Sequence, residues 1–513
     1  MSPKENLSMN KKDDSKFNNE QESSETNELN GNEQQPNELG YKMTFASVAG
    51  NALEMYDFTV FGYYSDVIGA QFFPPNQSES LALIESFAVL GLGFLVRPIG
   101  GAIIGKIGDI YSRKRALEIS IFVMTFPTVL LGCLPTYSQV GWLSTFLLIF
   151  LRVLQGLSVG GQFMAAIIFT LERKTDISGW GLWSATSISA GNVGIAIGGV
   201  ITSILRESLS REELYSWGWR LPFWLGIFAL IPAIYLRMQP EVDMINPSVS
   251  VSPNNTSLEN VTSEENRNDH EPKRNPLKEA LRKSNRLPLL IATLIPTLNA
   301  AAYHVLFVWV VIFMTDMIDP PVQHSFTINS ILSIIGGIPF PLIAGWMIDR
   351  VGNDGVLVAF TSIASIILYP LAIRYIGINW GQDEQPSDIQ IVFIVLVLAM
   401  LYALFATSQM PFIVTLFPRD IRLTSASLGY NISNATWGGF SPLLATVFAE
   451  RMNYFAAGCI VSAGALCTFI GVCITPGGFD SRVKRVADLK ELEERAHSTE
   501  TTEDNRLTQP LLP

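Results

Sequence analysis

Runs of about 20 apolar residues recur along the whole chain, and they restrict its fold more than any other feature. Two examples are "ALEISIFVMTFPTVLLGCL" at residues 116–134 and "IQIVFIVLVLAMLYALF" at residues 389–405. As a helix, each run is long enough to cross ~30 Å of hydrocarbon. Only 16% of the residues are charged, whereas a soluble protein has about 25%. The sequence therefore predicts a multi-pass membrane protein.

Polar breaks divide the apolar runs into twelve candidate helices, starting near residues 43, 80, 116, 142, 180, 219, 287, 325, 355, 388, 423 and 454. Between the sixth and the seventh lies a long polar stretch whose composition is typical of a linker between two bundles. We therefore predict an all-α membrane protein with twelve transmembrane helices in two six-helix bundles.

The polar ends of the chain are predicted to lie outside the bundles. Residues 1–40 carry nine acidic, four basic and one aromatic side chain, so they bury too little apolar surface to fold. The predicted regions are a disordered cytoplasmic tail at 1–40, an N-terminal bundle at 41–239, a cytoplasmic linker at 240–286, a C-terminal bundle at 287–476 and a cytoplasmic tail at 477–513. Near the end of the linker, Asn275 and Pro276 predict the start of a short helix.

The placement of basic residues predicts the orientation, because cytoplasmic loops are enriched in lysine and arginine. Such residues follow the second predicted helix, occur in the linker and follow the last helix; outside the linker they are Lys106, Arg113, Lys114, Arg115, Arg482, Lys484 and Arg485. Of the loops on the other side, only "RESLSREELYSWGWR" contains several arginines. Both termini are therefore predicted to be cytoplasmic, in a plasma membrane or bacterial inner membrane, with an organellar membrane as the alternative.

The sequence predicts no cofactor, metal site or enzyme activity. Its four cysteines lie in apolar runs without metal-ligand spacing. It also contains no phosphate-binding glycine loop, which argues against an ATP-driven pump. We expect no nucleic-acid partner.

An internal repeat supports the two-bundle prediction. "GKIGDIYSRKRAL" at 105–117 aligns with "GWMIDRVGNDGVL" at 345–357, and both follow the second helix of a predicted bundle. The alignment places Gly105 over Gly345 and Asp109 over Asp349. Repeats of this kind, with a site between the two halves, are typical of secondary transporters.

The chain resembles the major facilitator superfamily, and within it the metabolite:proton symporter family of proline/betaine, α-ketoglutarate, citrate and shikimate permeases. The resemblance covers about residues 41–475 and rests on five motifs in the family's order: "GNALEMYDF", "FLVRPIGGAIIG", "RVLQGLSVGGQF", "WGWRLPFWLG" and "LFPRDIRLTSASLGYNISNATWGGFSP". The chain departs from the family's pattern at Ile110, Ser112, Gln162, Thr415 and Leu416. The resemblance implies a monomeric transporter that carries a small polar metabolite together with a proton across the lipid bilayer by alternating access.

Glu54 and Asp57 are the most unusual residues of the first predicted helix. Their i, i+3 spacing places them on one face, and a charge at the centre of a span costs roughly 2.5 to 3.5 kcal/mol. Arg152 is expected at a similar depth, in a polar stripe with Gln155 and Gln162 on the fourth helix. We expect one of the two acids to bind the coupling proton and Arg152 to engage a substrate carboxylate; the alternative is a permanent salt bridge between helices.

The remaining substrate candidates are Arg97, Tyr303, Tyr430 and Asn431. Arg97 could line the substrate path or snorkel to lipid headgroups. Tyr303 is predicted to contact substrate, and Tyr430 and Asn431 either do so or hydrogen-bond between helices. His304 could relay a proton, although a lone histidine is more often a packing residue.

The predicted gating residues come from the superfamily resemblance and from the repeat. Asp109, Arg113 and Glu172 resemble the superfamily's cytoplasmic charge network, which latches one conformation. The full predicted set is Gly105, Asp109, Arg113, Glu172, Asp349 and Arg350.

Two other functions compete with proton-coupled symport. An uncoupled facilitator would use the same fold, but buried carboxylates disfavour it. A transporter-derived sensor would signal through its tails, but the heptad-like "DLKELEERA" in the C-terminal tail is too short for a stable coiled coil.

Overall fold

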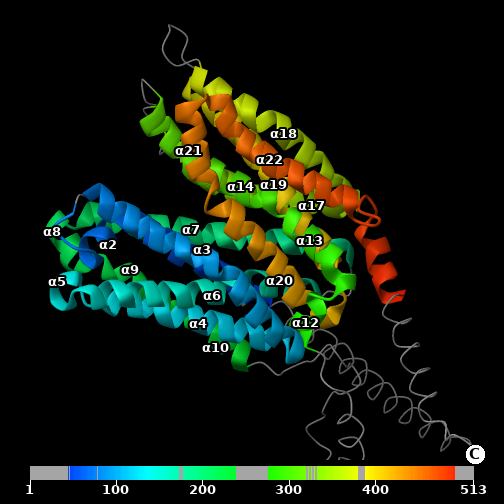
Figure 1. Ribbon diagram of the computed structural model, residues 1–513, viewed down its shortest axis with the longest axis horizontal. Coiled ribbons are helices and arrows are strands. Elements are labelled where there is room, and N and C mark those ends of the chain that lie inside the picture. Colours follow the sequence, from blue (N-terminus) through cyan, green and yellow to red (C-terminus); the bar gives the residue numbers. More distant parts are fainter. Residues whose placement is uncertain are drawn as a thin grey trace, which may run out of the picture. The chain divides into compact units, whose positions relative to one another are not determined.

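Helices make up nearly all of the described chain in this computed structural model (Figure 1). The structure describes residues 44–45, 47–77, 79–172, 177–238, 275–318, 322, 325, 328–329, 332–378 and 387–491. The predicted N-terminal tail, most of the linker and the end of the C-terminal tail lie outside these residues. The contacts reported below all belong to the unit Ser47–Pro513.

The N-terminal half contains six helical segments in the predicted order. They are residues 47–63 followed by α2 (Ser65–Phe72), α3 (Glu79–Ile110), α4 (Arg113–Cys133), α6 (Trp142–Glu172), α7 (Trp180–Ser208), and a sixth segment composed of α8 (Arg211–Glu213), η2 (Leu214–Gly218), α9 (Arg220–Leu225), η3 (Gly226–Ala229) and α10 (Leu230–Met238). The short helices α5 (Tyr137–Val140) and η1 (Ile177–Gly179) lie between the long ones.

The C-terminal half repeats this order after α12 (Pro276–Ala280) and η4 (Lys283–Asn285). Its segments are α13 (Arg286–Leu294), α14 (Thr297–Tyr303), η5 (His304–Trp309), α15 (Val310–Ile312) and η6 (Phe313–Met317); η7 (Leu332–Gly336) and α17 (Pro339–Val351); α18 (Asp354–Ile378); α19 (Asp388–Val414); η8 (Arg419–Ile421), α20 (Arg422–Ser433), η9 (Asn434–Gly438) and α21 (Ser441–Arg451); and α22 (Tyr454–Ile474). A further helix covers residues 482–491.

The helix starts follow local capping chemistry. Asn275 accepts a hydrogen bond from the backbone N–H of Leu277, and Pro276 occupies the first turn, which confirms the short helix predicted at the end of the linker. Ser112 caps α4 in the same way, accepting from the N–H of Arg115. These caps fix where α12 and α4 begin.

The predicted fold, with twelve helices in two sets of six, agrees with the described segments. Ten described helices are long and apolar enough to cross a membrane. The other two segments, residues 47–72 and 422–451, are interrupted by turns or π-helix, and they carry the polar residues discussed below.

Much of the outer surface of the helices is apolar, and polar side chains are buried between the helices together with apolar ones. Phe122, Phe146 and Phe393 are among many large apolar side chains that are more than half exposed, at 57%, 62% and 68%. A soluble monomer rarely exposes so much contiguous apolar surface. In a bilayer, lipid covers these side chains.

The two halves approach each other through α3 against α20 and through α7 against α17. A Cβ at Gly105 would lie 2.5 Å from the Cα of Thr424, and one at Gly345 would lie 2.7 Å from the carbonyl oxygen of Gly181. Since real Cβ atoms do not come so close, these two positions of the repeat require glycine.

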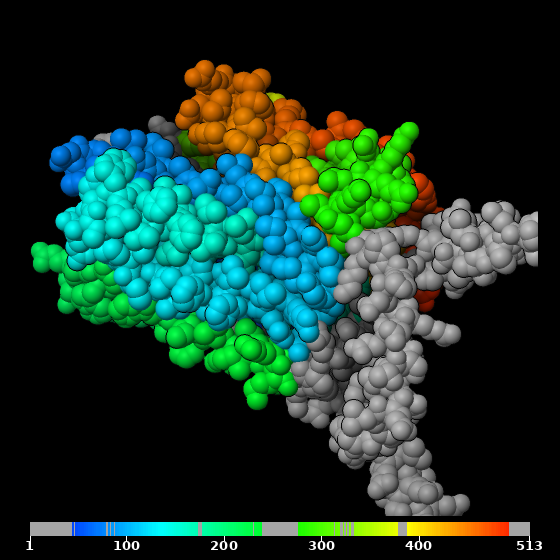
Figure 2. All heavy atoms as spheres, turned by 60° about the horizontal axis from the view of Figure 1, so that its bottom comes forward, coloured from blue at the N-terminus to red at the C-terminus, as the bar shows by residue number. Residues whose placement is uncertain are grey.

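Both approaches occur on the side of the bundle that carries α12, which we call the linker face. There α12 contacts α3, η8 and α20, and Figure 2 shows it in green beside the blue end of α3.

Candidate functional site

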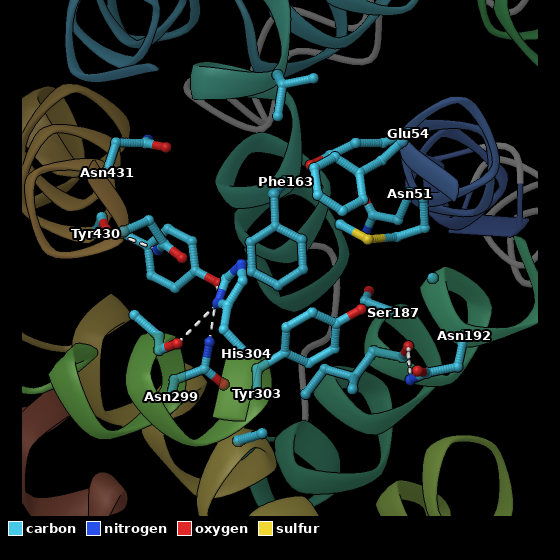
Figure 3. A pocket seen from close by; sticks show the side chains of 18 of the residues that line it. Asn51, Glu54, Phe163, Ser187, Asn192, Asn299, Tyr303, His304, Tyr430 and Asn431 are labelled. Atoms are coloured by element: carbon cyan, nitrogen blue, oxygen red, sulfur yellow. Dashed lines mark hydrogen bonds between the residues drawn. The ribbon is translucent and has the colours of Figure 1, made fainter. Parts of the chain in front are cut away.

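A cavity between the two halves brings together most of the predicted substrate and proton residues (Figure 3). It contains about 880 Å³ of space free of protein atoms. The predicted residues that line it are Glu54, Arg97, Tyr303, His304, Tyr430 and Asn431. Both halves of the repeat therefore contribute to its wall.

Glu54 and Arg97 form a loose pair at the N-terminal wall of this cavity. Their nearest nitrogen and oxygen are 3.9 Å apart, and the Arg97 side chain is 12% exposed. The guanidinium lies 4.1 Å from the ring centre of Phe94, which fixes its orientation. Among the described residues, the Oε2 atom of Glu54 and the Nε atom of Arg97 have no hydrogen-bond partner. Both groups can therefore accept a ligand without losing a strong contact.

Asp57 and Arg152 form a second, tighter pair, which does not line the larger cavity. The distance between them is 2.8 Å, and Asp57 also accepts hydrogen bonds of 2.9 Å from Thr128 and from Gln155. The Arg152 guanidinium lies 3.5 Å from the ring centre of Phe61. The carboxylate is thus held by three donors, as a structural ion pair would be.

A smaller cavity, with about 350 Å³ of empty space, adjoins both acid–arginine pairs. Glu54, Asp57, Arg97 and Arg152 all line it. Within the described part of the chain, Nε and one terminal nitrogen of Arg152 are buried without a partner. Polar atoms of this kind are normally satisfied by water. Both carboxylates therefore border the smaller cavity.

The structure separates the predicted polar stripe of the fourth helix from the larger cavity. Arg152 and Gln155 line the smaller cavity but not the larger one, and both donate hydrogen bonds to Asp57. Gln162 is fully buried and donates to the carbonyl oxygen of Gly50 at 2.7 Å, so it fastens the first helix to α6. Of the two predicted arginines, Arg97 is the one that faces the larger cavity.

The C-terminal wall of the cavity is aromatic. Tyr303 packs against the rings of Phe307 and Tyr402, with centroids 5.3 and 6.1 Å away. Tyr430 stacks on Phe163 of the other half, with a centroid distance of 5.2 Å. Large flat side chains shape such a cavity at little cost in conformational entropy.

His304 stands where α14 changes into the π-helical segment η5, a feature often found at functional sites. Its Nδ1 lies 2.8 Å from the carbonyl oxygen of Ala300, and a carbonyl oxygen can only accept, so Nδ1 donates. Its Nε2 is buried with no partner among the described residues. The ring packs edge-on against Phe94, the same ring on which the Arg97 guanidinium stacks.

Asn431 connects the two halves. Its side-chain amide donates to the carbonyl oxygens of Gly160 in α6 and Ser427 in α20. Asn431 also lines the cavity, so the hydrogen bond to Gly160 joins the two halves at the cavity wall.

Asp109 joins the halves at the linker face. It pairs with Arg113 and accepts hydrogen bonds from the backbone N–H groups of Leu423 and Thr424, at 3.1 and 2.8 Å. These N–H groups belong to the first turn of α20, where they have no partner within the helix. We call this set of contacts the first latch.

Glu172 extends the first latch. One of its oxygens pairs with Arg113 at 3.2 Å and the other with Arg422 at 2.8 Å. Arg113 and Glu172 belong to the N-terminal half and Arg422 to the C-terminal half, so the Glu172–Arg422 pair crosses between the halves. The structure thus brings Asp109, Arg113 and Glu172 together, as the sequence analysis expected.

Asp349 makes the equivalent contact in the other half, which we call the second latch. Its two oxygens accept from the backbone N–H groups of Gly181 and Leu182 at the start of α7, both at 2.8 Å. It also pairs with Arg482 at 2.9 Å. The predicted Arg350 takes no part in these contacts; it is exposed, with its guanidinium 4.0 Å from the ring centre of Trp346.

Several residues of the cavity wall were not predicted from the sequence. Asn51, Asn192, Asn299 and Tyr402 line the cavity, and asparagine within an apolar run was the available signal for the first three. Arg482 was used only as an orientation signal, because nothing in the sequence connects it with Asp349.

Comparisons with known proteins agree with this geometry. The family model "Major Facilitator Superfamily" matches residues 50–422. The shikimate transporter of Escherichia coli K12 is 27% identical over 434 residues, covering 82% of this chain and 92% of the relative. A putative proline/betaine transporter of Staphylococcus aureus COL is 29% identical over 414 residues, covering 79% and 81%. The citrate-proton symporter of Klebsiella pneumoniae is 25% identical over 426 residues, covering 83% and 89%.

Solved structures share the fold. The proton:xylose symporter XylE, bound to 6-bromo-6-deoxy-D-glucose, superposes with a TM-score of 0.67 at 16% identity, covering 88% of this chain and 99% of XylE. The chain is therefore a multi-pass membrane transporter of the major facilitator superfamily, with relatives in its metabolite:proton symporter family, and not an enzyme.

Proposed function

We propose that this transporter carries a small zwitterionic or carboxylate metabolite in symport with a proton, by alternating access. The observation that carries the proposal is the loose Glu54–Arg97 pair, which faces the cavity from one half of the repeat. The shikimate, proline/betaine and citrate transporters among the relatives support the substrate class, since each of these solutes bears a carboxylate.

Arg97 is the anchor for the substrate carboxylate. A guanidinium binds a carboxylate through two parallel hydrogen bonds, and Arg97 lines the cavity with its Nε unsatisfied by the described residues. Arg152 is engaged by Asp57 and lies outside the larger cavity. Tyr303, Tyr430 and the asparagines then contact the rest of the substrate.

Glu54 is the coupling residue. When a substrate carboxylate occupies Arg97, Glu54 loses its charged partner, and two carboxylates beside one arginine repel each other. Taking up a proton from the water outside removes that repulsion, so that substrate and proton bind together. On release to the other side, Glu54 gives up the proton and pairs with Arg97 again.

Asp57 and His304 remain the alternative proton sites. Asp57 is held by Arg152, Gln155 and Thr128, so protonating it would break strong contacts. His304 has an unpaired Nε2 among the described residues, but its ring is enclosed by aromatic side chains. Asp57 is therefore less free than Glu54 to exchange a proton with the larger cavity, whereas His304 lines that cavity and is the second candidate.

The two latches serve as the gate at the linker face. With both closed, the halves are fastened to each other beside α12; opening them would let the cavity reach that face. We further propose that the linker face is cytoplasmic, because the loop after α3 and the segment after α22 are basic.

Uptake into proteoliposomes tests the proposal. Labelled proline, betaine, α-ketoglutarate, citrate and shikimate are supplied with and without an inward proton gradient. We expect one of these substrate classes to accumulate only with the gradient. If uptake were the same with and without the gradient, and the substrate only equilibrated across the membrane, the protein would be a facilitator.

A further inference from the structure

The two latches differ in where their arginine comes from. In the first latch, Arg113 follows Asp109 by four residues, within the repeat. The corresponding position after Asp349 is Asn353, which carries no charge. In its place, the second latch uses Arg482, which follows the last membrane helix.

Arg482 is buried to a degree that is unusual for an arginine. Its side chain is 1% exposed, and it donates to the carbonyl oxygen of Ile348 as well as pairing with Asp349. Burying an arginine is costly unless its partners are well placed. The position of Arg482 is therefore tied to the second latch.

Neighbouring contacts hold the rest of this segment on the loop between α17 and α18. Asn353 donates to the carbonyl oxygen of Phe479 at 2.6 Å. Arg485 pairs with the buried Asp354 and donates to Thr415 at 3.1 Å. Lys484, in contrast, is 61% exposed and pairs only with Asp480 of its own segment in the described structure.

Asp349 is shared between Arg482 and the other half of the protein. Its Oδ1 atom accepts from Gly181 and pairs with Arg482, while its Oδ2 atom accepts from Leu182. The guanidinium thus fixes the carboxylate in the orientation that caps α7. Without it, the carboxylate is free to turn toward water, and α7 loses a rigid acceptor.

We propose that Arg482 is a positioning residue of the gate, through which the segment at residues 478–485 keeps the linker face closed. The inference rests on the proposed gating role of the latches and extends it to the C-terminal segment. Release of that segment would weaken the second latch and raise the population that is open at the linker face.

Cysteine accessibility in purified protein tests this without any substrate or gradient. Ser427 is fully buried in α20, and its hydroxyl has no partner among the described residues, so Ser427→Cys costs no known hydrogen bond. The four native cysteines are replaced first. In nanodiscs, we expect Arg482→Gln to raise the rate of maleimide labelling at position 427 roughly fivefold or more. Lys484→Gln, the matched control in the same segment, should label as the parent does.

A double variant separates gating from general loosening. If Arg482 acts through Asp349, then Arg482→Gln should add little to the labelling rate of Asp349→Asn. The inference would be overturned if Arg482→Gln raised the labelling rate of Asp349→Asn by the same factor as it raises that of the parent protein. It would also be overturned if the single Arg482→Gln variant labelled at the rate of the parent. Should the single variant fail to reach the membrane, the double variant carries the test, because it leaves no unpaired charge.

The same assay distinguishes this inference from the proposed gate. If Asp109→Asn raises labelling and Arg482→Gln does not, the gate stands and the role of the C-terminal segment is wrong. If neither substitution changes labelling, the gating role of both latches is wrong.

Discussion

Asp109 and Asp349 make the same contact in opposite directions. Asp109, from the N-terminal half, caps α20 of the C-terminal half, and Asp349, from the C-terminal half, caps α7 of the N-terminal half. In each case a carboxylate meets the positive end of a helix and satisfies N–H groups that have no partner in that helix. The repeat seen in the sequence is thus a repeat of the same contact at the linker face.

Asp109→Asn is expected to favour the conformation that is open at the linker face. The amide keeps one acceptor oxygen but loses the charge that attracts Arg113 and the first turn of α20. A coupling of this kind is typically 1–3 kcal/mol, so we expect a shift of about 5- to 150-fold in the conformational equilibrium. Accessibility labelling measures the shift, and intrinsic substrate affinity should stay within about threefold. A collapse of affinity with unchanged accessibility would contradict the gating role.

Arg97→Gln should weaken substrate binding without loss of the folded protein. A hydrogen bond to a charged group contributes about 1.5–3 kcal/mol, which corresponds to a loss of affinity of roughly 10- to 150-fold. Binding to detergent-purified protein measures it. Arg206→Gln, at an exposed pair with Asp66, is the matched control and should bind as wild type does. Wild-type affinity in Arg97→Gln would exclude Arg97 as the anchor.

Arg152→Gln is predicted to reduce stability more than substrate affinity. It leaves Asp57 as a buried carboxylate without its charged partner, and breaking such a pair costs about 3–5 kcal/mol. The double variant Asp57→Asn/Arg152→Gln removes both charges and should recover a large part of that loss. Thermal unfolding followed in detergent compares the three proteins. Equal stability of Arg152→Gln, the double variant and wild type would show that the pair is not structural.

The sequence predicted the helices and most of the cavity because both depend on local patterns. Long apolar runs specify spans, and Glu54, Arg97 and Tyr430 stand out as polar residues within them. Which acid pairs with which arginine could not be predicted, since it depends on how α3 and α6 pack around the first helix. Counting depth along the helices placed Arg152 near both acids, but side-chain packing assigned it to Asp57.

The same limit explains why Arg482 was not predicted as the partner of Asp349. The repeat identified Asp349 but gave no reason to connect it with Arg482, which is separated from it by four membrane helices. Arg350, the next residue in the sequence, was predicted instead, yet the turn of α17 directs it onto Trp346. Contacts between distant segments require the three-dimensional structure.

Topology is tested by labelling cysteines in intact cells. We expect a cysteine at Glu212, an exposed position in the loop opposite the linker face, to react with an impermeant maleimide from outside. A cysteine at Ser257 in the linker should be protected. The reverse pattern would invert the proposed orientation.

Glu54→Gln tests the central claim most directly. Glutamine keeps the size and hydrogen-bonding capacity of the side chain but cannot carry the proton, so the substrate should lose its coupling to the gradient. We expect proteoliposomes containing this variant to exchange labelled for unlabelled substrate at a rate near wild type, yet to accumulate none above equilibrium under an inward proton gradient. Accumulation by Glu54→Gln at the wild-type level would contradict the account and transfer the coupling role to Asp57 or His304.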